Sequence, residues 1–333
     1  MTRVRRRSIW LVRGMQAAIL MALLALVGGL FVHALDELRA RGIQAGFDFL
    51  SQPAGFEIGE GPILSGASEP LWRAFLAGFA NTIRVTIPAL LLTSVLGVAI
   101  GLGRVIPYRL LNILCACYVE LVRNVPLLVQ LLMWYFVLTH YLPSSDDPYS
   151  LGDSVFVSKG GVFFPWPVGS DESWWPVALE WPERGTFNVS GGAALTPEFL
   201  SVSVALVVYT AAFVAEAVRA GLQAVPRGQV QAAQSLGLRP LQQMRWVIFP
   251  QALRVMVPSI TNQYLNLIKN STLGVAVGYP ELVSVSNTTL NQTGRAFECI
   301  TILISVYLSL SLLISVFMNL YNAKVALRGM APT

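Results

Sequence analysis

Long apolar runs with almost no charge are the feature that most limits what this chain can fold into. A helix that crosses a lipid bilayer needs about 20 consecutive, mostly apolar residues. Six segments approach or exceed that length, at about Met15–Val32, Ile83–Leu102, Leu110–Leu138, Phe199–Ala220, Leu253–Val277 and Cys299–Tyr321. Only 12% of all residues are charged, against about a quarter in a typical soluble domain. The sequence therefore predicts an all-α membrane protein with six transmembrane helices.

The basic residues orient these helices, because lysine and arginine are enriched in cytoplasmic loops. With the N-terminus inside, the cytoplasmic segments hold 14 of the 23 basic residues, namely Arg3, Arg5, Arg6, Arg7, Arg13, Arg104, Arg109, Arg219, Arg227, Arg239, Arg245, Arg254, Lys324 and Arg328. Sixteen of the 18 acidic residues fall in or beside the opposite loops. Both distributions predict cytoplasmic N- and C-termini. They also argue against a nucleic-acid partner, because the basic residues sort by loop and form no basic face.

The N-terminal segment has two interpretations. Arginines precede the apolar run, and Val32-His33-Ala34 resembles the cleavage site of a signal peptide. The run is long for a signal peptide, however, and five further spans follow it. We therefore expect an uncleaved first helix, followed by an outside loop that reaches residue 70.

The second outside loop, 141–197, is rich in proline, glycine, tryptophan and acidic residues. Phe164-Pro165-Trp166-Pro167 and Trp174-Trp175-Pro176 cannot form regular helix, because proline lacks an N–H group and restricts the residue before it. We expect this insert to be a structured, non-catalytic cap on the outer face.

A helical elbow is expected on the cytoplasmic side, between the fourth and fifth spans. Pro226 suits the first turn of a helix, and Gly237 lies where that helix would end in a left-handed residue. Pro240 can open a second short helix that runs to Phe249 and is stopped by Pro250. A compact, mostly uncharged helical elbow at the membrane surface suits docking into a groove of another protein.

The residues of this elbow resemble the cytoplasmic signature of the permeases of ATP-binding-cassette (ABC) importers. Gln231-Ala232-Ala233, three residues, Gly237, nine residues and Val247-Ile248-Phe249-Pro250 match the pattern Glu-Ala-Ala, three residues, Gly, nine residues, Ile-x-Leu-Pro. The spacing agrees throughout. Gln231 replaces the usual glutamate and so removes one charge, whereas Val247 and Phe249 are apolar exchanges.

Other segments are similar to the polar amino-acid branch of these permeases: Asn81–Ile83, Tyr118–Gln130, Tyr209–Glu216 and Leu267–Leu273. The similarity covers about Leu71–Leu327, which implies a permease transmembrane domain at 71–327 and a short tail at 328–333. The extra N-terminal span and the long second loop are similar to the general L-amino-acid permeases. The resemblance implies the type I importer fold.

The resemblance also implies a transporter in which separate subunits deliver the substrate, form the pathway and hydrolyse ATP. A periplasmic amino-acid-binding protein delivers the substrate, two permease subunits form the pathway, and ABC ATPase subunits drive it. The second permease is expected to be a different chain. The loop Arg227–Pro250 then transmits closure of the ATPases to the helices in the bacterial inner membrane.

The chain itself is not expected to hydrolyse ATP. A phosphate-binding P-loop needs a lysine followed by serine or threonine, and neither residue follows Lys159, Lys269 or Lys324. ATP and Mg²⁺ are therefore expected on the partner subunit, and no cofactor on this chain. With three cysteines in apolar segments and two histidines, a metal site is not expected either.

Charged residues inside predicted spans are costly and usually face a pathway or a partner. Glu120 and Arg123 are three residues apart on one helix face and can pair, and Glu216 and Arg219 repeat that spacing. Lys269 lies among amide side chains, those of Asn262, Gln263, Asn266 and Asn270. These residues either line the route of a zwitterionic amino acid or form structural ion pairs. Intramembrane charges also leave open an ion-coupled secondary transporter, the alternative function.

Overall fold

The computed structural model describes residues 46–152, 154–169, 176–186 and 188–327, together with scattered helical positions between 14 and 37. The segments 1–13 and 328–333 lie outside the described residues, as do many positions of the predicted first span, Met15–Val32.

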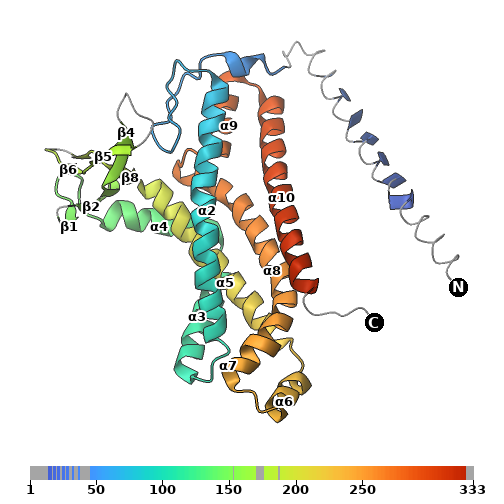
Figure 1. The fold of residues 1–333 in the computed structure, drawn as a ribbon. Coiled ribbons are helices and arrows are strands. Elements are labelled where there is room, and N and C mark those ends of the chain that lie inside the picture. Colours follow the sequence, from blue (N-terminus) through green and yellow to red (C-terminus); the bar gives the residue numbers. More distant parts are fainter. Residues whose placement is uncertain are drawn as a thin grey trace.

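Helices dominate the described part of the chain (Figure 1). The α-helices are α2 (Leu71–Gly103), α3 (Arg109–Asn124), α4 (Leu127–Tyr141), α5 (Pro197–Gln223), α6 (Arg227–Ser235), α7 (Pro240–Gln243), α8 (Phe249–Asn270), α9 (Leu282–Thr293) and α10 (Ala296–Leu327). Short 3₁₀ segments occupy Asp48–Ser51 and Ser271–Val277, and one π-helical turn covers Met244–Ile248. Helices α2, α5 and α8 form the centre of the bundle, and α10 packs beside α8 and α9 (Figure 1).

Three described helices are long and apolar enough to cross a membrane: Leu71–Gly103, Pro197–Gln223 and Ala296–Asn322. The bent pair α3 and α4 makes a fourth if both helices count as one span. Helix α8 covers most of the predicted fifth span but does not meet this test, because polar side chains interrupt it. Length and apolar composition thus identify three or four spans among the described helices, and the count of six stays a prediction.

The predicted third span is not one continuous helix. It breaks between Asn124 and Leu127, and the axes of α3 and α4 differ by 103°. Pro126 is the cause, because it has no N–H group to continue the helix and disfavours helical geometry at Val125, whose backbone is extended. The prediction placed Pro126 correctly but underestimated its effect.

The buried Gln130 side chain stabilises this bend. Its Nε2 donates hydrogen bonds to the carbonyl oxygens of Val122 at 2.9 Å and Val125 at 3.0 Å, which the break leaves without helical partners.

Replacing Gln130 by leucine is expected to destabilise the protein by about 1–3 kcal/mol, the cost of leaving buried acceptors unsatisfied. The thermal unfolding midpoint of the detergent-solubilised protein measures this loss. An unchanged midpoint would show that the bend does not depend on the two hydrogen bonds.

Glycines let α2 and α5 approach closely. A Cβ atom at Gly101 would lie 2.7 Å from the carbonyl oxygen of Ala215 and 2.7 Å from Cβ of Val218. At Gly97 the added atom would lie 2.6 Å from Cβ of Val214. The helix axes therefore sit at a distance that only glycine allows at these two positions.

In its described residues, the insert between α4 and α5 folds into short antiparallel strands, which confirms that Phe164–Pro167 does not form helix. A four-stranded sheet has the order β1 (Tyr149–Leu151), β2 (Val155–Ser158), β3 (Gly161–Phe164) and β8 (Ala193–Leu195). Two further pairs join β4 (Trp166–Gly169) to β5 (Pro176–Glu180), and β6 (Glu183–Arg184) to β7 (Val189–Ser190). Strand β8 leads directly into α5, whose first turn is capped by the Thr196 hydroxyl accepting from the Phe199 N–H at 3.1 Å.

Candidate functional site

A polar cavity of about 230 Å³ lies between α5 and α8. Its lining comprises Tyr209, Thr210, Phe213, Gln263, Asn266 and Asn270. The amide side chains carry both donors and acceptors but no charge. The buried Thr210 hydroxyl has no hydrogen-bond partner within the described residues.

Helical spacing explains why these side chains meet. Gln263, Asn266 and Asn270 are three and four residues apart, so they share one face of α8. On α5, the Tyr209 ring packs against that of Phe213 with 4.9 Å between ring centroids. The cavity thus combines an amide face with an aromatic wall.

The structure separates Lys269 from its amide neighbours. Asn266 and Asn270 line the cavity, whereas the Lys269 side chain is exposed and lies outside the lining. One step along a helix turns a side chain by roughly 100°, which moves Lys269 off the amide face. Asn262 is likewise exposed and outside the lining.

A charge cluster joins α2 to α5. The Glu216 carboxylate pairs with Arg104 through Oε2 and with Arg219, whose Nε donates at 3.0 Å. The prediction that Glu216 and Arg219 pair is confirmed. Arg104 joins them from 112 residues away, so one carboxylate serves two guanidinium groups.

Glu120 and Arg123 do not form the ion pair that their spacing allows. The described ion pairs do not include them; instead, the Arg123 guanidinium lies over the Phe213 ring, 5.0 Å from its centroid. Both side chains are exposed at the surface of α3. Arg123 therefore packs behind the aromatic wall of the cavity, and its cation–π contact replaces the predicted pair.

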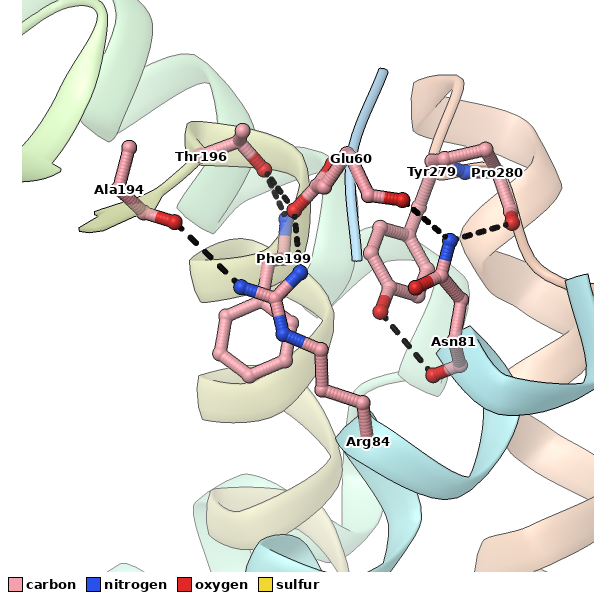
Figure 2. Close-up of polar contacts among 8 residues, drawn as sticks. All are labelled: Glu60, Asn81, Arg84, Ala194, Thr196, Phe199, Tyr279 and Pro280. Atoms are coloured by element: carbon pink, nitrogen blue, oxygen red, sulfur yellow. Dashed lines mark hydrogen bonds and ion pairs between the residues drawn. The ribbon is translucent and has the colours of Figure 1, made fainter. Parts of the chain in front are cut away.

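A second polar network connects the segment before α2 to Asn81 and Arg84 of α2 and to the first turn of α5 (Figure 2). Arg84 Nη1 donates to Glu60 Oε1 at 3.1 Å, and the Thr196 hydroxyl donates to the same oxygen at 2.7 Å. The guanidinium of Arg84 also stacks on the Phe199 ring, 4.5 Å from its centroid. Burial raises the pKa of the Glu60 carboxyl above its ordinary value, although the hydrogen bonds from Thr196 and Arg84 oppose that rise.

Asn81 holds the backbone of this network in place. Its side-chain Nδ2 donates to the backbone carbonyl oxygens of Glu60 and Pro280, each at 3.0 Å. The backbone carbonyl of Asn81 accepts from the Tyr279 hydroxyl at 3.0 Å (Figure 2). Gly61 allows the close approach, because a Cβ atom there would lie 1.8 Å from Asn81 Oδ1.

Sequence reasoning did not single out Glu60 or Arg84 as site residues. One signal was present: Arg84 is a charged residue one position inside the predicted second span, Ile83–Leu102. Nothing local to Glu60 distinguishes it from the other acidic residues of its loop.

The predicted elbow lies at the end of α5 and α8 opposite the sheets (Figure 1). Gly237 has a φ of 72°, and the hydrogen bonds from its N–H to Gln234 and from the Leu238 N–H to Ala233 end α6 in a Schellman motif. The buried Gln243 side chain donates to the Leu238 carbonyl at 2.6 Å and closes the turn. The left-handed glycine is confirmed.

The second half of the elbow differs from the prediction. Helix α7 ends at Gln243, a π-helical turn follows, and α8 begins at Phe249, so Pro250 lies in the first turn of α8 and does not stop a helix. Because Pro250 has no N–H group, the preceding turn widens, and the Phe249 N–H bonds to the Met244 carbonyl.

The signature residues of the elbow are mostly accessible. Exposed ones are Arg227, Gln231, Ala232, Gly237, Phe249 and Pro250, whereas Val247 is half-buried and Ala233 is buried. Large apolar side chains extend the exposed surface, with Leu236 and Leu241 each about 80% exposed. This combination is typical of a surface that another protein covers.

Residues 93–327 match the family of binding-protein-dependent transport system inner membrane components. Among curated proteins, the chain is 38% identical to YhdX of Escherichia coli, over 94% of this chain and 93% of that protein. It is 37% identical to the general L-amino acid transport system permease protein AapQ of Rhizobium johnstonii, over 85% and 84% of the two chains. A crystal structure of an amino acid ABC transporter with histidines aligns with a TM-score of 0.55 and 25% identity, over 75% of this chain and 94% of that one.

These matches and the shared helical architecture define an inner-membrane transport component. The chain belongs to the family of binding-protein-dependent transport system inner membrane components.

Proposed function

We propose that this chain is the permease subunit of an ABC importer that moves L-amino acids from the periplasm to the cytoplasm. The cavity between α5 and α8 carries the proposal within the fold, because it is neutral, amide-lined and large enough for a small polar solute. The family membership and the amino-acid permeases among the relatives support the substrate class. They leave the ion-coupled secondary transporter without support.

The distribution of basic residues and the family membership together support a membrane topology for the chain. We propose six membrane spans with both termini in the cytoplasm, in a bacterial inner membrane. On this topology, the strand-rich insert at 141–197 and the segment 46–70 face the periplasm, where an amino-acid-binding protein docks. A second permease subunit, a different chain by the resemblance to the general L-amino-acid branch, completes the pathway.

The elbow is the proposed contact with the ATPase. Its two short helices connect α5 directly to α8, the helices that line the cavity. Movement of the elbow by an ATPase subunit would therefore move both walls of the cavity. ATP and Mg²⁺ belong to that partner, and the role of this chain is translocation.

Co-purification tests the assembly. An affinity-tagged chain is isolated from its own membranes in mild detergent, and the accompanying proteins are identified. Recovery of an ATPase with a P-loop, and of a second permease, is expected. Recovery of the chain alone, with amino-acid uptake that survives ATP depletion, would contradict the proposal.

Replacing Asn266 by leucine is expected to reduce ATP-dependent amino-acid uptake about five- to thirtyfold. The change removes an amide from the lining of the cavity, and loss of one hydrogen bond to the solute costs about 1–2 kcal/mol. Uptake by membrane vesicles, normalised to the amount of assembled complex, measures the effect.

Asn319→Leu is the matched control, because Asn319 is exposed on α10 and the chemical change is the same. Its uptake is expected to equal that of the wild type. Equal uptake by Asn266→Leu and the wild type would remove this cavity from the pathway.

A further inference from the structure

A larger cavity, of about 510 Å³, lies beside the Glu60–Arg84 pair and apart from the cavity between α5 and α8. Three parts of the chain enclose it: the segment 59–62, Arg84 of α2, and the insert residues Phe164, Trp166 and 193–196. It is the meeting point of the two segments that the sequence assigns to the outer face.

The charges at this cavity balance. Glu60 and Arg84, the charged side chains of its lining, form an ion pair and therefore contribute no net charge. An isolated anion or cation gains little there, whereas a molecule that carries both charges can meet both partners. Aromatic side chains of Phe164 and Trp166 supply the apolar part of the wall.

Within the described residues, the ion pair does not use all of its hydrogen-bonding capacity. Both hydrogen bonds to the Glu60 carboxylate end on Oε1, and none reaches Oε2 from the residues that the structure describes. Arg84 Nη2 donates to the Ala194 carbonyl at 3.4 Å, which is long for a hydrogen bond. A carboxylate oxygen and a guanidinium donor are thus available side by side (Figure 2).

We propose that this outer cavity binds the zwitterionic backbone of an amino acid, with its ammonium group on Glu60 Oε2 and its carboxylate on Arg84. The inference rests on the proposed import of amino acids and adds a second site to it. Recognition of the backbone alone places no demand on the side chain, for which the cavity has room beside Phe164 and Trp166. The site would hold the amino acid beside Arg84 of α2 and the start of α5 before it enters the cavity between α5 and α8.

Gly59 offers a probe position for this site. It lines the cavity, is exposed, and a Cβ atom there meets nothing within 4 Å. The test uses Gly59→Cys in the assembled complex in nanodiscs, with Cys115, Cys117 and Cys299 replaced by alanine and without the binding protein. A maleimide reagent labels the new thiol, and L-leucine competes at concentrations that saturate uptake.

L-Leucine is expected to slow labelling at least threefold. Two analogues that each lack one charged group, 4-methylpentanoate and 3-methylbutan-1-amine, are expected to give no protection. Adding Glu60→Gln, which keeps an acceptor for Thr196 but removes the charge, is expected to abolish protection by L-leucine. Leu64→Cys, exposed on the same segment but outside the lining, is expected to label at one rate with and without L-leucine.

Equal labelling of Gly59→Cys with and without L-leucine would overturn the proposal, as would equal protection by all three compounds. If Glu60→Gln is too unstable to assay, the comparison of L-leucine with its two analogues tests the proposal by itself. ATP-dependent L-leucine uptake by the wild-type complex is measured in parallel. Uptake without protection counts against the outer site only, whereas protection without ATP-dependent uptake counts against the proposed importer.

Discussion

Replacing Glu216 by glutamine is expected to destabilise the protein by about 1–3 kcal/mol, between the ranges for exposed and for buried ion pairs, because its side chain is 25% exposed. The carboxylate pairs with both Arg104 and Arg219. Without its charge, two guanidinium groups remain close together with no anion between them. Because Arg104 belongs to the end of α2 and Glu216 to α5, the loss falls on the contact between two central helices.

Thermal unfolding of the detergent-solubilised protein measures this effect. Asp147→Asn is the control, because the ion pair between Asp147 and Arg184 is largely exposed, with 77% and 52% of the two side chains accessible. Exposed pairs contribute about 0–1 kcal/mol, so the control is expected to unfold near the wild-type temperature. Equal midpoints for both variants would show that the Glu216 cluster is not structural.

Replacing Gly101 by alanine is expected to cost about 1–3 kcal/mol, the usual penalty for one extra carbon in a packed interior. The new Cβ would lie 2.7 Å from the Ala215 carbonyl oxygen and 2.7 Å from Cβ of Val218. Neither atom can move by side-chain rotation, so α2 and α5 must separate. Gly101→Leu adds three more carbons and is expected to prevent accumulation of folded protein.

Gly228→Ala provides the matched control. It makes the same chemical change inside a helix, but a Cβ atom at Gly228 meets nothing within 4 Å. Alanine favours helix over glycine by about 1 kcal/mol, so this variant is expected to be as stable as the wild type or more so. If Gly101→Ala and Gly228→Ala had the same thermal unfolding midpoint, the close packing of α2 against α5 would be contradicted.

Local features of the fold were predictable because they depend on residues near one another in the chain. Gly237 was expected to end α6 in a left-handed conformation, and its φ is 72°. The pairing of Glu216 with Arg219 followed from their spacing of three residues. The insert was expected to lack helix because of its prolines, and it forms strands.

Prolines were harder to interpret, because their effect depends on the chain around them. Pro126 was predicted to lie inside one long span, but it lies between two helices whose axes differ by 103°. Pro250 was expected to end a helix, but it lies in the first turn of α8 after a π-helical turn. In the second case, the wider turn accommodates the missing N–H group and the helical path continues.

The sequence by itself determined the membrane class and the left-handed turn of the elbow at Gly237, because hydrophobic length and helix-ending residues are properties of a single segment. Only the tertiary structure decided that Arg104 joins Glu216, that Arg123 stacks on Phe213, and that Glu60 meets Arg84 and Thr196. These contacts connect residues from 24 to 136 positions apart. Their physical reason is packing: α2, α3 and the segment before α2 lie against α5 and bring distant side chains together, and no periodicity along the chain encodes that.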